Sequence, residues 1–107
     1  MSTLFIINTP VLTDYGLWRF EGPLEESTAR SLVAGDFLSA LGHEGAAAFL
    51  SARLGVEFPV NRVRVNLEPG DRALVLRLKG RLPENRILNE EEMAELPFEL
   101  GLLTRLE

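Results

Sequence analysis

The chain has 107 residues, a net charge of −5 at pH 7 and no cysteine. This length allows one domain with one hydrophobic core, and 46% apolar with 25% charged residues is typical of a globular protein. The lack of cysteine excludes disulfides, thiolate nucleophiles and cysteine-bound metals, and a single histidine argues against a zinc site. No apolar run is long enough to span a bilayer and the N-terminus lacks a basic leader, so we expect a cytoplasmic protein with no membrane partner and no cofactor.

Two short extended segments open the chain. Residues 3–8 form a β-branched and aromatic run, which predicts a buried strand that ends at Asn8. Residues 17–20 follow a turn signal at 14–16 and predict a second extended piece.

Helix signals occupy the middle of the chain. Pro23 opens a helix with acidic residues in its first turn, and Gly35 closes it. Residues 36–41 are ambiguous. A second, alanine-rich helix runs from 43 to 54, with Gly55 as its C-cap.

Residues 59–67 and 72–79 alternate between apolar and mostly basic side chains on either side of a turn. That turn has Pro69-Gly70 where a type II turn requires them, so the pattern predicts a β-hairpin with one apolar and one basic face. In this hairpin Arg62 lies opposite Arg77. Directly opposed like charges destabilise a sheet unless an anion or glutamate side chains neutralise them.

The remaining segments predict a loop at 81–84, a short helix at 89–96 and a last strand at 98–106. The order of the elements favours an α/β or α+β fold, with a mixed, roughly five-stranded sheet and helices mainly on one face. We find no linker, repeat or low-complexity segment, which predicts a single domain over residues 1–107.

Charge is unevenly distributed along the chain. Residues 53–86 contain eight basic and four acidic residues, a net charge of +4, whereas the rest of the chain has a net charge of −9. The negative total argues against duplex DNA as a partner. A basic segment within an acidic chain suits a compact anionic ligand, although a solvated strand face with ordinary salt bridges has the same composition.

His43 is the only histidine, the residue type best suited to acid–base chemistry near neutral pH. It opens a helix, where free backbone N–H groups favour an anion, and the preceding Gly42 lets a ligand approach the backbone. A helix-capping or surface histidine has the same signature.

Four further residues are candidates for a site. Arg62 and Arg81 offer paired donors to phosphate oxygens, Glu84 can orient an imidazole or accept a hydroxyl proton, and Asn8 ends a strand. Each is also an ordinary surface or turn residue. The chain has no phosphate-binding glycine loop, serine elbow or carboxylate metal cluster, which leaves metal-free acid–base work on a phosphodiester, or plain binding.

Six motifs occur in the order and spacing of one known family. They are Asn8-Thr-Pro-Val-Leu-Thr-Asp-Tyr-Gly16, Leu41-Gly-His-Glu44, Asn61-Arg62-Val63, Glu68-Pro-Gly-Asp71, Arg81-Leu-Pro-Glu84 and Glu99-Leu-Gly-Leu-Leu103. In these motifs the chain resembles the viral ring nucleases, anti-CRISPR proteins first seen as small uncharacterised proteins of archaeal viruses and found also in bacteria and phages. The resemblance covers almost the whole chain.

The resemblance implies a two-fold homodimer that binds cyclic tetra-adenylate in a pocket shared by both subunits. It implies metal-independent cleavage of the ring to linear di-adenylates with a 2′,3′-cyclic phosphate, which ends type III CRISPR signalling. The family's catalytic histidine falls on His43 and its arginine–glutamate pair on Arg81 and Glu84. The ligand-contacting asparagine falls on Asn8 and the second arginine on Arg62. After Asn8 this chain has Thr-Pro-Val where the viral loop has serine and asparagine.

The implied mechanism uses a nucleophile from the ligand. The 2′-hydroxyl attacks its neighbouring phosphate, Arg62 or Arg81 stabilises the phosphorane, and His43 protonates the leaving 5′-oxygen. Two other functions fit the same residues. One is a dimer that sequesters the cyclic nucleotide without cutting it, and the other is a structural or DNA-associated viral protein.

Overall fold

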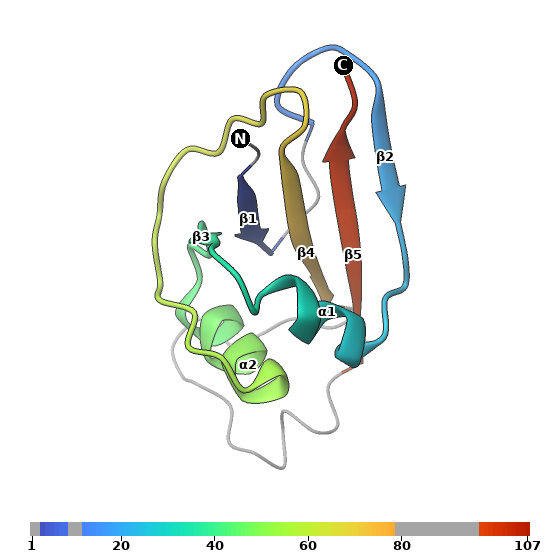
Figure 1. Ribbon diagram of the computed structural model, residues 1–107. Helices are drawn as coiled ribbons and strands as arrows, with labels where there is room; N and C mark the ends of the chain where they lie inside the picture. The colour runs from blue at the N-terminus through green and yellow to red at the C-terminus, as the bar shows by residue number, and fades with distance from the viewer. Residues whose placement is uncertain (1–2, 9–11, 79–96) are drawn as a thin grey trace.

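The computed structural model describes residues 3–8, 12–78 and 97–107 (Figure 1). These residues form one α+β domain with a five-stranded mixed sheet and two helices. The elements in chain order are β1 (Leu4–Ile7), β2 (Trp18–Glu21), α1 (Glu26–Leu32), β3 (Leu38–Ser39), α2 (Glu44–Leu54), β4 (Arg72–Leu78) and β5 (Phe98–Arg105).

The sheet has the strand order β2-β5-β4-β1-β3. Strand β1 runs parallel to both of its neighbours, with Ile6 beside Ser39 of β3 and Ile7 beside Val75 of β4. Strand β5 runs antiparallel to β4 and to β2. The predicted mixed sheet is therefore confirmed, and the ambiguous residues 36–41 contain the short edge strand β3.

The main core lies between one face of the sheet and both helices. Because side chains alternate along a strand, Leu4 and Ile6 of β1 share a face with Leu74 and Leu76 of β4. Helix residues that complete this core are Ala29, Ala46, Ala47, Phe49, Leu50 and Leu54. Figure 1 shows both helices gathered near the end of the sheet to which the β4 arrow points. The prediction of helices mainly on one face is confirmed.

The opposite face of the sheet carries a second, smaller core. It is formed by Phe5, Ile7, Ala73, Val75 and Leu103, with Leu67 and Val65 packed against them. Leu67 is fully buried. Leu67 and Val65 belong to an irregular segment, residues 61–68, which we call the strap. Figure 1 shows it as the yellow-green to yellow stretch that leads to the start of β4.

The predicted hairpin of residues 59–67 with 72–79 is wrong. The strap forms no strand, and both edges of β4 are already occupied, by β1 on one side and β5 on the other. Arg77 therefore faces Glu99 of β5, with which it forms an ion pair at 3.7 Å, and does not face Arg62. The alternation of the strap arises because Val65 and Leu67 pack on the sheet while its arginines remain exposed.

The turn that precedes β4 is confirmed. Gly70 has a φ of +95°, as the third position of a type II turn requires, and the Asp71 N–H donates to the Glu68 carbonyl at 2.9 Å. The buried Asp71 carboxylate accepts the N–H groups of Thr3 and Glu68 at 2.9 and 3.0 Å. The turn is thereby tied to the start of β1.

The boundaries of α2 agree with the sequence signals, whereas α1 is shorter at both ends than Pro23 and Gly35 predict and has Val33 as its C-cap. Helix α2 begins directly after His43, and Gly55 ends it with a φ of +69° and an N–H bond to the Ser51 carbonyl. Helix α1 begins later than predicted, at Glu26, because residues up to Glu25 are extended and the Leu24 N–H pairs with Leu100 of β5. The predicted loop at 81–84 and helix at 89–96 lie outside the described residues.

Candidate ligand-binding site at the ends of β1 and β3

His43 is the N-cap of α2. Its backbone is extended, with φ −120° and ψ 122°, and its Nδ1 accepts the N–H of Ala46 at 3.2 Å. This bond satisfies one of the free donors at the helix start, as serine or aspartate does at other N-caps. A ring nitrogen that accepts carries no proton, so Nε2 holds the hydrogen of the neutral imidazole and is its only donor.

Gly42 and Arg62 lie in contact beside this cap. The Arg62 Nε donates to the Gly42 carbonyl at 2.7 Å, and a Cβ atom added to Gly42 would lie 3.2 Å from the Arg62 Cγ. The bridge of Leu41 with Val60 and the bond from the Asn61 N–H to the Leu41 carbonyl, 2.8 Å, hold the two segments together. The structure therefore brings together three of the predicted site residues.

Asn8 lies on a cleft at the carboxyl end of β1. The cleft has a volume of about 780 Å³ and is lined by Ile7, Asn8, Thr13, Ala40, Arg64, Val65 and Asn66. Ala40 borders β1 because its N–H donates to the Ile6 carbonyl at 2.9 Å. A cleft outside the carboxyl ends of parallel strands is a common ligand position in sheets with helical crossovers.

The residues that line the cleft are close in sequence to Gly42, His43 and Arg62, but these three residues do not line it. Ala40 precedes Gly42 by two residues, and Arg64 follows Arg62 by two. Gly42, His43 and Arg62 are not among the lining residues of the single chain. Among the predicted residues that the structure describes, only Asn8 lines the cleft directly. Thr9, Arg81 and Glu84 lie outside the described residues.

Arg64, like Thr13 and Asn66, is a polar lining residue that the sequence did not mark as a site candidate. It is exposed, and no hydrogen bond or ion pair joins its side chain to the residues that the structure describes. In the sequence Arg62 and Arg64 alternate with valines, but this pattern predicts the exposed face of a strand and does not indicate a ligand contact. Together with Asn8, Thr13 and Asn66, Arg64 gives the cleft a polar rim over the apolar Ile7 and Val65.

A second hollow, of about 140 Å³, lies at the other edge of the sheet. Phe20, Arg77 and Glu99 are among its lining residues, and the arginine and glutamate neutralise each other at 3.7 Å. This hollow is too small for a nucleotide, and it includes none of the predicted site residues.

Within residues 3–8, 12–78 and 97–107, no three histidine, cysteine or carboxylate residues are grouped as a metal site would require. Within the same ranges no helix is long and apolar enough to cross a membrane.

The chain is similar to proteins of archaeal viruses and of a bacterium. It is 33% identical over 106 residues to uncharacterised protein 26 of Sulfolobus islandicus filamentous virus, covering 92% of this chain and 88% of that protein. It is 40% identical over 72 residues to protein ORF117 of Acidianus two-tailed virus, covering 66% and 62% of the two chains. It is 28% identical over 103 residues to the uncharacterised protein YddF of Bacillus subtilis, covering 94% and 95%.

A solved structure and a family model agree with these similarities. The fold matches that of B116 from Sulfolobus turreted icosahedral virus with a TM-score of 0.81 and 20% identity, over 97% of this chain and all of that one. The model described as STIV B116-like matches residues 4–100. The chain therefore belongs to the STIV B116-like family.

Proposed function

We propose that the protein is a metal-independent ring nuclease that binds cyclic tetra-adenylate and cleaves it to linear di-adenylates with a 2′,3′-cyclic phosphate. This activity would end type III CRISPR signalling and make the protein an anti-CRISPR factor. The observation that carries the proposal is the polar cleft at the carboxyl end of β1, whose lining residues Ala40 and Arg64 lie two residues along the chain from the Gly42–Arg62 contact. The relation to archaeal viral proteins is consistent with it.

The chemistry of this region suits a phosphodiester ring. Arg62 and Arg64 lie on one strap and present guanidinium groups, which bind phosphate oxygens in pairs. Helix α2 begins after His43, which follows the Gly42 that Arg62 contacts. The positive end of a helix favours an anion. The cleft volume of about 780 Å³ is within the range of known ligand pockets, and its apolar Ile7 and Val65 can contact a base.

The proposed reaction is a transesterification within the ligand. The 2′-oxygen forms a bond to its neighbouring phosphorus, the bond from phosphorus to the 5′-oxygen breaks, and the proton lost from the 2′-hydroxyl is balanced by the one gained by the 5′-oxygen. Arg62 stabilises the charge that builds on the phosphorane. Arg81 and Glu84 are assigned to the site by the family resemblance, as partners of the phosphorane and of the imidazole.

The hydrogen bond at His43 limits how the imidazole acts. The neutral ring, with Nδ1 on the Ala46 N–H, donates a hydrogen bond through Nε2 to a phosphate or leaving oxygen. A doubly protonated ring cannot accept that N–H. If a doubly protonated His43 transfers a proton to the 5′-oxygen, the hydrogen bond between its Nδ1 and the Ala46 N–H must break before or during the reaction.

The second candidate function is binding without cleavage. The cap bond favours it, because an imidazole whose Nδ1 accepts the Ala46 N–H can donate a hydrogen bond to a phosphate through Nε2 without transferring a proton. Such a protein would lower the free concentration of the ring and leave it intact.

One experiment separates the two functions. Calorimetry measures binding of cyclic tetra-adenylate, and chromatography of the same incubation measures product. A ring nuclease yields linear di-adenylate with repeated turnover, whereas a sequestering protein binds one ring per site and returns it unchanged. Absence of both binding and product contradicts the proposed function altogether.

A further inference from the structure

The strap is fastened at its two ends and has no strand partner between them. At its start the Asn61 N–H bonds to the Leu41 carbonyl, and at its end the Leu67 N–H bonds to the Thr13 hydroxyl at 3.0 Å. The residues between these points include Arg64, Val65 and Asn66, which form one wall of the cleft. The shape of that wall therefore depends on how firmly the ends are held.

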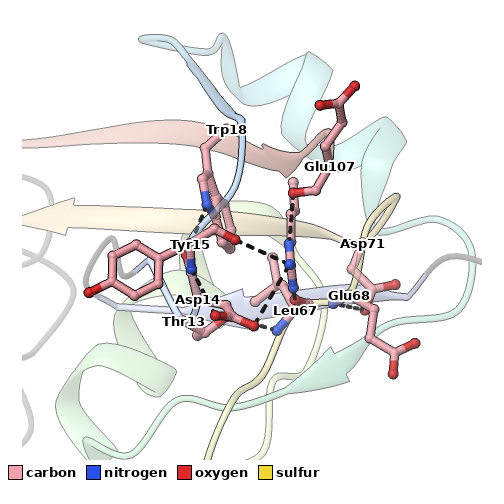
Figure 2. A network of polar contacts seen from close by, with 9 residues as sticks. Thr13, Asp14, Tyr15, Trp18, Leu67, Glu68, Asp71 and Glu107 are labelled. Carbon is pink, nitrogen blue, oxygen red and sulfur yellow. Dashed lines mark hydrogen bonds and ion pairs between the residues drawn. The ribbon is translucent and has the colours of Figure 1, made fainter.

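Arg105, the last residue of β5, holds the second end. Its Nη1 donates to the Leu67 carbonyl at 2.6 Å, its Nη2 to the Tyr15 carbonyl at 3.3 Å and its Nε to the Glu107 carbonyl at 3.2 Å. Figure 2 shows Tyr15, Leu67 and Glu107 converging on this network from three separate segments. One guanidinium thus joins the strap, the segment after β1 and the strand β5.

The surroundings keep the guanidinium in place. It lies 5.7 Å from the centre of the Trp18 ring and 3.8 Å from the Asp14 carboxylate, and its side chain is only 13% exposed. The Trp18 indole in turn donates to the Asp14 carbonyl at 3.2 Å. Only arginine has a planar fork with donors in three directions, so lysine cannot replace these bonds together.

We infer that Arg105 is a positioning residue for the cleft. It holds Leu67 and, through the Thr13–Leu67 bond, also Thr13, so that Thr13 and Asn66 face the ligand in one arrangement. Arg105 is not among the residues that line the cleft. The identity of the ligand rests on the proposed function, but the role of Arg105 in holding the strap does not.

The test compares Arg105→Met with Arg53→Met. Arg53 is a matched control because it also forms an ion pair, 2.7 Å from Glu26, and lies over an aromatic ring, 4.8 Å from the Phe98 centre, but on the helix-covered face. Amide hydrogen exchange measures the strap without a ligand. Arg105→Met should raise exchange at Leu67 and at residues 13–17, whereas Arg53→Met should raise it in α1 and α2 only.

Kinetics with cyclic tetra-adenylate measures the consequence for the cleft. Arg105→Met should raise KM by about tenfold to a hundredfold with kcat within about threefold of wild type, because the wall binds the ring and does not contact the reacting atoms. Arg53→Met should leave both constants unchanged. Arg105→Lys, which retains the charge and one donor group, should fold if the methionine variant does not, and should show a smaller rise in KM.

The inference is overturned if exchange at Leu67 is unchanged in Arg105→Met and Arg105→Lys, or if exchange rises while KM stays at the wild-type value. An equal rise of KM in Arg53→Met would also overturn it, since general loss of stability would then account for the effect. If the wild-type protein neither binds nor cuts the ring, the proposed function fails, and the exchange comparison still decides whether Arg105 fastens the strap.

Discussion

The Nδ1 atom of His43 accepts the backbone N–H of Ala46 at 3.2 Å, so the one histidine of the chain caps the helix that it begins. A capping role alone would make this residue structural. The proposed role of His43 toward a phosphate rests on its neighbours, because the adjacent Gly42 accepts a hydrogen bond from Arg62 and the cleft lined by Asn8 also includes Ala40 and Arg64. The two roles are separable, because other side chains cap helices without acid–base chemistry.

The first prediction separates capping from chemistry at His43. Asparagine is a good N-cap and alanine is not, so His43→Asn should retain the stability of α2 while His43→Ala loses about 1 kcal/mol of unfolding free energy. Both variants should lose about a hundredfold to ten-thousandfold in the rate of cleavage and still bind the ring. Urea unfolding and single-turnover kinetics measure the two effects. Near wild-type cleavage by His43→Asn would reject a chemical role for the imidazole.

The second prediction concerns the arginines of the strap. Arg62→Ala and Arg64→Ala should each weaken binding of cyclic tetra-adenylate by about 1.5–3 kcal/mol, because each removes a charge-assisted contact to phosphate. Arg19→Ala is the control, since Arg19 is exposed on β2 and, among the described residues, pairs only with Glu21, at 3.6 Å. Titration calorimetry measures the affinities. Equal losses in all three variants would mean that positive charge anywhere on the protein surface contributes equally, and that no specific site binds the cyclic nucleotide.

The third prediction tests the contact of Gly42 with Arg62. In Gly42→Ala the new Cβ would lie 3.2 Å from the Arg62 Cγ, so the flexible arginine must shift by a few tenths of an ångström. Affinity for the ring should fall about threefold to tenfold. The unfolding free energy should change by less than about 0.5 kcal/mol.

The matched control for that variant is Gly35→Ala. Within the described part of the chain, a Cβ at Gly35 meets no heavy atom within 4 Å beyond its own neighbours, so this variant should bind the ring as the wild type does. If Gly42→Ala also binds normally, the position of Arg62 does not matter to the ligand.

The fourth prediction is a dimer in solution. Cyclic tetra-adenylate has two-fold symmetry, and a two-fold interface presents the same residues to opposite phosphates of the ring. Light scattering at micromolar concentration should give twice the mass of 11.9 kDa. A fully active monomer would refute the shared pocket.

The parts of the fold that could be predicted from sequence are those with local signals. The apolar run of β1 and the boundaries of α2, set by His43 and Gly55, follow from side chains within a few residues of each element. The partners of β4 could not be predicted in the same way. The apolar alternation of Val65 and Leu67 indicates that one side of the strap is buried, but it does not identify the partners of β4, because the strands that pair with β4 lie far away in sequence.

The site shows the same division. Asn8, Gly42, His43 and Arg62 were singled out from strand ends, a helix start and motif spacing, and the structure brings the last three together. Arg64 could not be identified in this way, because nothing in the neighbouring sequence distinguishes an exposed arginine that contacts a ligand from one that contacts only solvent. Only the path of the strap across the sheet places it on the cleft.

The most direct test of the central claim is cleavage of labelled cyclic tetra-adenylate in excess chelator, with its 2′-deoxy ring in parallel and products resolved by chromatography. We expect linear di-adenylate with a 2′,3′-cyclic phosphate from the first ring, binding without cleavage of the second, and much slower cutting of cyclic hexa-adenylate. These results are expected because, in the proposed function, the nucleophile belongs to the ligand and two copies of Asn8, His43, Arg62, Arg81 and Glu84 form the site. Loss of activity in chelator, or hydrolysis of the 2′-deoxy ring, would contradict the account.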